Sequence, residues 1–114
     1  MTTIYKIMTA QQWQEAEAVG RFEGAPIDLK DGYIHFSDAG TVRETAARHF
    51  AGQPDLLLAA VEAERLGEAL RWEVSRGGAL FPHLYASLPL DHILWIRPLP
   101  LDEGGSHLFP AELP

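Results

Sequence analysis

Polar side chains occur at alternate positions in three separate segments that are rich in β-prone residues. The six side chains are His35, Ser37, Arg71, Glu73, His83 and Tyr85. Because successive residues of a strand point to opposite faces, the members of each pair share one face of their strand. Neighbouring strands would bring these faces into one cleft, and the order of the strands is the point that the sequence leaves open.

These residue types suit an anionic ligand that contains a flat ring. The guanidinium of Arg71 offers a planar fork to a phosphate or carboxylate. Histidine and serine donate directional hydrogen bonds, and aromatic rings offer a stacking surface. Glu73 or His83 can carry a proton. We therefore predict the catalytic residues His35, Glu73 and His83 and the ligand-binding residues Ser37, Arg71, Phe81 and Tyr85.

Each candidate also has an ordinary structural interpretation. Arg71 and Glu73 are spaced as an exposed ion pair, which contributes little to stability. His83 stands between Pro82 and Leu84, as a packing residue would. The remaining candidates can equally bond a loop, begin a turn or fill the core. Sequence alone therefore leaves open a ligand site and a set of unrelated polar contacts.

The first half of the chain predicts two helices, each after a strand. Residues 4–8 (IYKIM) form a β-prone run, and Thr9 with Gln12 has the spacing of a capping box for a helix that ends at Gly20. A loop is expected from residue 21 to 30. Residues 33–37 alternate as a strand with Ile34 and Phe36 toward the core, and a second capping box at Thr41 opens a helix to about residue 50.

The second half predicts strands. The apolar run at residues 55–61 is typical of a buried central strand, and residues 70–75, 81–85 and 91–97 are expected as further strands. Pro82 favours an edge position for its strand because proline cannot donate to a ladder. Trp13 and Trp72 are expected to anchor the core. We predict an α+β fold with one domain over residues 1–98 and an irregular tail over residues 99–114.

Composition narrows the class of protein. A length of 114 residues with 46% hydrophobic residues is typical of one domain. A formal charge of -7 argues against a nucleic-acid partner. Without cysteine there is no thiolate zinc site, iron–sulfur cluster or cysteine nucleophile, and no motif predicts another metal. No apolar run is long enough for a membrane span, so a cytoplasmic location is expected.

Four segments together resemble a small bacterial family, domain of unknown function 952. They are IYKI (4–7), DGYIHFSD (31–38), LRWE (70–73) and FPHLYASL (81–88). That family is grouped with folds similar to the ADP-ribosyltransferases, which implies two small sheets around a cleft that binds NAD. The IHFS stretch is also similar to one in the RNA 2′-phosphotransferases.

By this resemblance, His35 and Ser37 line the nicotinamide side of the cleft, and NAD, ADP-ribose or a phosphorylated ligand is the expected small-molecule partner and substrate. The common transferases carry His or Arg on the first strand, where this chain has Lys6 or Tyr5. They also carry a Glu in a third sequence block, to which FPHLYASL corresponds by this resemblance. FPHLYASL has no acidic residue, and Glu73 lies on the preceding strand. The alternative is a non-catalytic module that binds a small ligand or a protein on the same fold. The oligomeric state is left open.

Overall fold

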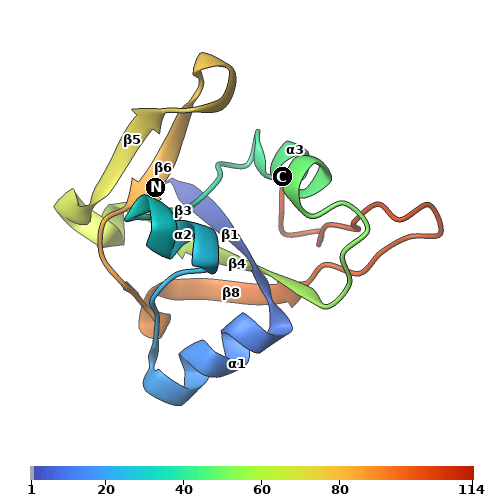
Figure 1. Cartoon of the computed structure of the whole chain (residues 1–114), viewed down its shortest axis with the longest axis horizontal. Helices are drawn as coiled ribbons and strands as arrows, with labels where there is room; N and C mark the ends of the chain where they lie inside the picture. The colour runs from blue at the N-terminus through green and yellow to red at the C-terminus, as the bar shows by residue number, and fades with distance from the viewer. Residues whose placement is uncertain (1) are drawn as a thin grey trace.

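The computed structural model describes residues 2–114, apart from the side chain of Arg76, and has an α+β organisation with small antiparallel sheets (Figure 1). Its α-helices are α1 (Ala10–Val19), α2 (Pro26–Asp31) and α3 (Val42–His49). The strands are β1 (Thr3–Thr9), β2 (Arg21–Phe22), β3 (Ile34–His35), β4 (Leu56–Glu62), β5 (Leu70–Val74), β6 (Leu80–Leu84), β7 (Leu88–Pro89) and β8 (Ile93–Pro98). Short 3₁₀ segments cover Ala63–Ala69, Arg76–Gly78 and Leu90–His92.

The main sheet has the order β1-β4-β8, with both neighbours antiparallel to β4. The apolar run of β4 is therefore central, as its composition predicts. Alternate residues of β1 feed two different cores: Ile4 and Met8 belong to one buried cluster, and Tyr5 and Ile7 to the other. This sheet is thus covered on both faces, and Figure 1 shows α1 on one side of it and α3 on the other.

A second three-stranded sheet has the order β3-β6-β5 and carries most of the predicted site residues. The prediction that Pro82 marks an edge strand is wrong, because β6 lies in the centre. Phe36 donates its backbone N–H to the Pro82 carbonyl at 3.0 Å, so Pro82 points its backbone groups toward the β3 side. Proline has no N–H with which to donate a second hydrogen bond to Phe36. Its central position is tolerated because regular β3 ends at His35, one residue before Phe36.

The region from residue 21 to 30 differs from the expected loop. It contains β2, which pairs with β7 as a third sheet, and the single-turn helix α2. Two sheets and two helices were expected, and the structure adds one of each. Pro26 stands at the start of α2, where its missing N–H costs nothing, and Gly32 ends the helix with a left-handed backbone.

Two other local predictions have opposite outcomes. The Thr9–Gln12 capping box is confirmed: Thr9 Oγ1 accepts from the Gln12 N–H, and Gln12 Oε1 accepts from the Thr9 N–H. Thr41 caps no N–H of α3, because its hydroxyl donates to Asp38 instead. The expected core position of Trp72 is also wrong, since this side chain is 40% exposed.

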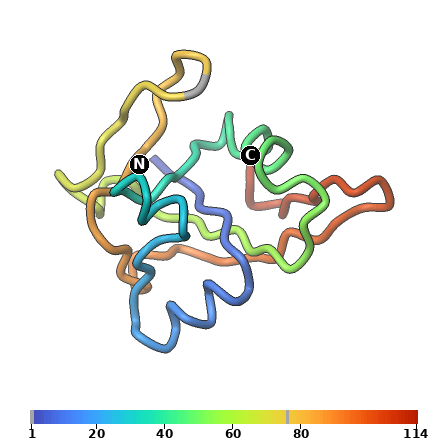
Figure 2. Tube along the Cα trace, viewed as in Figure 1, coloured from blue at the N-terminus to red at the C-terminus, as the bar shows by residue number. Residues whose placement is uncertain are grey.

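The segment after Pro98 folds back along α3 (Figure 2). It contains no helix or extended strand, yet Leu99 and Leu113 are buried in the same cluster as Val42 and Ala46 of α3. Arg43 donates to the Pro114 carbonyl. In the described residues, no helix has both the length and the hydropathy to cross a membrane.

Candidate functional site

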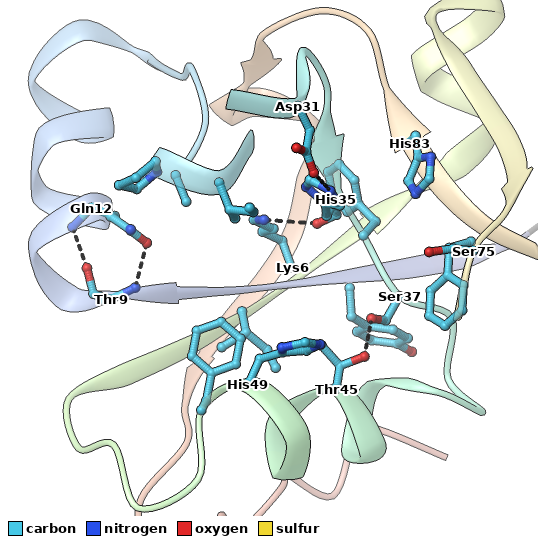
Figure 3. Close-up of a pocket in the computed structure, with 18 of the residues that line it drawn as sticks. Lys6, Thr9, Gln12, Asp31, His35, Ser37, Thr45, His49, Ser75 and His83 are labelled. Atoms are coloured by element: carbon cyan, nitrogen blue, oxygen red, sulfur yellow. Dashed lines mark hydrogen bonds and ion pairs between the residues drawn. The ribbon is translucent and has the colours of Figure 1, made fainter. Parts of the chain in front are cut away.

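A cavity of about 650 Å³ lies between the main sheet, α3 and the β3-β6-β5 sheet (Figure 3). Four predicted site residues line it: His35, Ser37, Phe81 and His83. The other three, Arg71, Glu73 and Tyr85, are not on its wall. Tyr5, Phe36 and Phe50 make much of the remaining wall apolar and aromatic. The cavity is within the size range of small-molecule sites.

His35 is held by two carboxylates of α2. Its Nδ1 lies 2.6 Å from Asp28 Oδ1, and its Nε2 lies 2.9 Å from Asp31 Oδ2. Figure 3 shows the imidazole and the Asp31 carboxylate facing one another at the cavity. Carboxylates at both ring nitrogens fix the orientation of this imidazole, and its Nε2 is occupied by Asp31. His35 and Asp31 both line the cavity.

Asp28 is the buried centre of this arrangement. Its carboxylate accepts from the backbone N–H groups of Ala25 and His35 and forms an ion pair with Lys6 at 3.0 Å. Burial works against ionisation, but the His35 hydrogen bond and the Lys6 charge outweigh it and lower the pKa of Asp28 from 3.8 to about 2. Asp28 is therefore an anion at neutral pH.

The ammonium group of Lys6 is buried and paired inside the protein. Its Nζ donates to Asp28 and, at 2.9 Å, to the His35 carbonyl. Burial lowers the pKa of Lys6, and the Asp28 carboxylate offsets part of that effect. Both contacts tie β1 to the segment that carries His35, so Lys6 orients the histidine rather than offering a free charge to the cavity.

His83 forms the second imidazole–carboxylate pair. Its Nδ1 lies 2.8 Å from Glu73 Oε1, which also accepts from the Tyr85 hydroxyl at 2.7 Å. Hydrogen bonds from Tyr85 and His83 lower the pKa of Glu73. Arg71 places its guanidinium 4.9 Å from the Tyr85 ring centre. Glu73 therefore orients His83 from outside the cavity, and Tyr85 holds Glu73 in place. Arg71 is not placed to bind an anion in the cavity.

The register of the sheet explains why the two histidines meet. His35 pairs with His83, and His83 pairs with Arg71, so the three lie in one row across β3, β6 and β5. The two imidazole centres are 5.5 Å apart. Tyr33 packs against both, with ring centres 4.6 Å from His35 and 4.1 Å from His83. The alternation within each strand predicted that both histidines lie on the polar face of their strands. The pairing of β3 with β6 then places the two side chains next to each other.

Ser37 sits at the other end of the cavity. Its backbone forms a bridge with Tyr5, and its hydroxyl lies 3.0 Å from the Thr45 hydroxyl (Figure 3). Phe81 is buried and also lines the cavity. Ser37 thus links the main sheet to α3, and its side chain reaches the wall that lies away from the two histidines.

Four residues that organise the site were not among the predicted site residues: Asp28, Asp31, Tyr33 and Lys6, the last of which was named only through the family resemblance. Two of them lie on α2, in the region expected to be a loop. A signal was present, because Pro26, Asp28 and Gly32 have the spacing of a short helix with Pro at its start, an acid in its first turn and Gly at its end. The resemblance pointed to Lys6 on the first strand, but a lysine within an apolar strand gives no sign that its partner is Asp28.

The arrangement can perform acid–base chemistry on a bound molecule. Two imidazoles, each oriented by a carboxylate, face one cavity. Asp31 is the only carboxylate among the described residues of the wall. Within those residues, no group of three or more His, Asp or Glu is arranged to hold a metal ion.

Comparison with known proteins places this arrangement in a family. Protein CC0527 from Caulobacter crescentus, solved by X-ray crystallography, is 50% identical over 98% of each chain, with a TM-score of 0.94. Its solution NMR structure gives 53% identity over 93% of this chain and 91% of that one, with a TM-score of 0.84. No curated protein matches the chain. The model of the family described as Protein of unknown function (DUF952) matches residues 7–96, most of the chain and both histidines, and the chain therefore belongs to that family.

Proposed function

We propose that the cavity binds a small nucleotide-like ligand, NAD or ADP-ribose, that His83 takes a proton in its reaction, and that His35 orients Asp31 beside it. The observation that carries the proposal is that two histidines of the cavity wall, His35 and His83, are each oriented by a carboxylate behind the wall, Asp28 and Glu73 respectively. An imidazole oriented by a carboxylate beside a cavity, as His83 is by Glu73, is the arrangement of a general base.

The wall favours the nicotinamide and its ribose as the part of the ligand that enters. Aromatic side chains of Tyr5, Phe36, Phe50 and Phe81 offer flat surfaces for a ring. Lys6 is already paired with Asp28, and Arg71 lies outside the wall. Among the described wall residues, no lysine or arginine is therefore left for the phosphates, which we place at the mouth of the cavity.

Cleavage of the bond between nicotinamide and ribose is the reaction class that we propose. The bonding electrons leave with the pyridinium nitrogen, so nicotinamide departs neutral and positive charge develops on the ribose. Asp31 would stabilise that charge, as the ionised carboxylate of a glycosidase does. A water or another acceptor hydroxyl then attacks the anomeric carbon, and His83, oriented by Glu73, takes its proton. The choice of this reaction class rests on the resemblance to the ADP-ribosyltransferases, and we propose that the chain shares their fold.

The second candidate is a binding module without catalysis. Glu73, the expected acid of the site, points its Oε1 at His83 and Tyr85 rather than lining the cavity. If Asp31 does not replace it, the ligand is bound and left intact.

Thermal unfolding with NAD tests binding. At a ligand concentration 100-fold above Kd, the native state gains about 2.7 kcal/mol, which raises the Tm by roughly 10 °C for a chain of this size. His35→Ala should lose the shift. His92→Ala removes a histidine that lies outside the cavity and should retain it. An unchanged shift in His35→Ala, or no shift of the wild type with NAD or ADP-ribose, would contradict the proposal.

Release of free nicotinamide over hours, followed by chromatography, separates the two candidates. We expect release by the wild type and its loss in Asp31→Asn with NAD binding retained. Binding by the wild type with no release would favour the binding module instead.

A further inference from the structure

Strand β5 is a free edge of the β3-β6-β5 sheet. It pairs with β6 on one side only, and Figure 1 shows it at the outer margin of the molecule. Its apolar side chains are exposed where a monomer would normally protect them: Trp72 is 40% exposed and Val74 is 70% exposed. Leu80, which pairs with Val74 across the hairpin, is also exposed. An unprotected edge with apolar side chains is a surface that other strands can join.

The backbone of β5 offers its unpaired groups at alternate residues. Pro82 points its backbone toward β3, so its partner Trp72 is not in a hydrogen-bonded pair with β6. In an antiparallel ladder such pairs alternate, which turns the N–H and C=O groups of Leu70, Trp72 and Val74 outward. Ser75 fits this pattern, because its N–H bonds inward to the Ala79 carbonyl.

The sequence of this edge is complementary to itself. When two copies of Leu70–Val74 pair antiparallel about Trp72, each Leu70 faces the other copy's Val74. Each Arg71 then faces the other copy's Glu73. The Arg71–Glu73 positions are the non-hydrogen-bonded ones of that ladder, where side chains approach most closely. Within its own chain Arg71 lies over the Tyr85 ring and forms no ion pair with a described residue, so its guanidinium can still pair with the other copy's Glu73.

We infer that β5 is a dimer interface at which two copies of this chain pair edge to edge around a two-fold axis through Trp72. The backbone groups of Leu70, Trp72 and Val74 supply the ladder, and the two Arg71–Glu73 pairs fix its register and direction. The interface joins two three-stranded sheets into one of six strands. It also sets Arg71 of one copy beside the Glu73 that bonds His83 of the other, so each copy contributes a charge to the support of its neighbour's histidine.

Sedimentation velocity and light scattering across a dilution series test the inference. The wild type should reach twice the 12.6 kDa of one chain. Either single variant, Arg71→Glu or Glu73→Arg, places like charges opposite each other at both symmetric contacts of the dimer. Each should raise the dimer dissociation constant at least about tenfold. The double variant Arg71→Glu/Glu73→Arg restores opposite charges and should recover most of the affinity. High salt should reduce the difference between the single variants and the wild type.

Arg48→Glu is the matched control for Arg71→Glu, because it makes the same change in net charge at an exposed site of α3 and should leave the dimer intact. Circular dichroism shows whether each variant is folded. Three results would overturn the inference. They are a wild type that stays monomeric at about 1 mM, a dimer that the single variants leave unchanged, and a double variant no better than the single ones.

Discussion

At the scale of single residues, the site depends on one buried carboxylate. Asp28 is 2% exposed and contacts Lys6, Ala25 and His35, which lie on three different segments. Asp31 is on the same helix, but among the described residues its carboxylate accepts from His35 alone, and it is partly exposed. The two aspartates, three residues apart, therefore have different roles. Asp28 connects the segments that form the site, and Asp31 faces the cavity.

We expect Asp28→Asn to destabilise the protein by about 3–5 kcal/mol, because it leaves the buried Lys6 ammonium without its counter-charge. Asp31→Asn is the matched control and should cost less than about 1 kcal/mol, since its carboxylate is partly exposed. Urea unfolding at pH 7 measures both. Equal losses in the two variants would contradict the central position of Asp28.

Acid sensitivity follows from the lowered pKa of Asp28. A carboxyl group with a folded pKa of about 2 and an ordinary value of 3.8 stabilises the native state above pH 4, by roughly 2.5 kcal/mol. That contribution is lost as the pH falls from about 4 toward 2, because the unfolded chain takes up the proton first. The difference in unfolding free energy between wild type and Asp28→Asn should shrink over this window, and a constant difference would be evidence against it.

At the scale of elements, local patterns predicted most segments and misplaced those that tertiary contacts decide. The apolar run of β4 identified a central strand, and the alternation in β3, β5 and β6 identified the shared face of His35 and His83. Helix α2 was missed because one turn is too short to be stable alone and depends on the contacts of Asp28. The central position of β6 was missed because Pro82 was expected to leave a gap in the ladder. Its missing N–H would face the β3 side, and regular β3 has already ended there.

Gly24, which precedes α2, provides a test at this scale. Its φ is +128°, and a Cβ there would lie 3.0 Å from the Asp28 Cβ. Gly20 is a matched control, with φ +86° and nothing within 4 Å of an added Cβ. Gly20→Ala should cost roughly 1–2 kcal/mol for the left-handed backbone alone. Gly24→Ala should cost roughly 1–3 kcal/mol more, because it also displaces Asp28. Equal losses on thermal unfolding would show that Asp28 is not crowded.

At the scale of the whole molecule, the main sheet separates two cores with different purposes. One core lies with α1 and the strands that carry the histidines, and the other lies with α3 and the segment after Pro98. The cavity opens where these halves meet, between His35 and His83 on one wall and Thr45 and His49 of α3 on another. The position of α3 therefore sets the width of the cavity.

The C-terminal segment secures α3 in that position, and Leu113 is the residue that tests it. Leu113 is 5% exposed and packs in the cluster with Val42 and Ala46. Leu113→Ala should therefore cost roughly 2–3 kcal/mol by removing buried apolar contacts. The neighbouring Glu112 pairs with Arg97 on the surface, and Glu112→Ala should change stability by less than about 0.5 kcal/mol.

Because α3 forms one wall of the cavity, the loss at Leu113 should extend to ligand binding. Amide hydrogen exchange should increase in Val42–His49 for Leu113→Ala and stay unchanged for Glu112→Ala. NAD, if it binds as proposed, should then bind more weakly to the first variant. Faster exchange confined to residues 99–114, with α3 as protected as in the wild type, would mean that α3 holds its position without the segment that covers it.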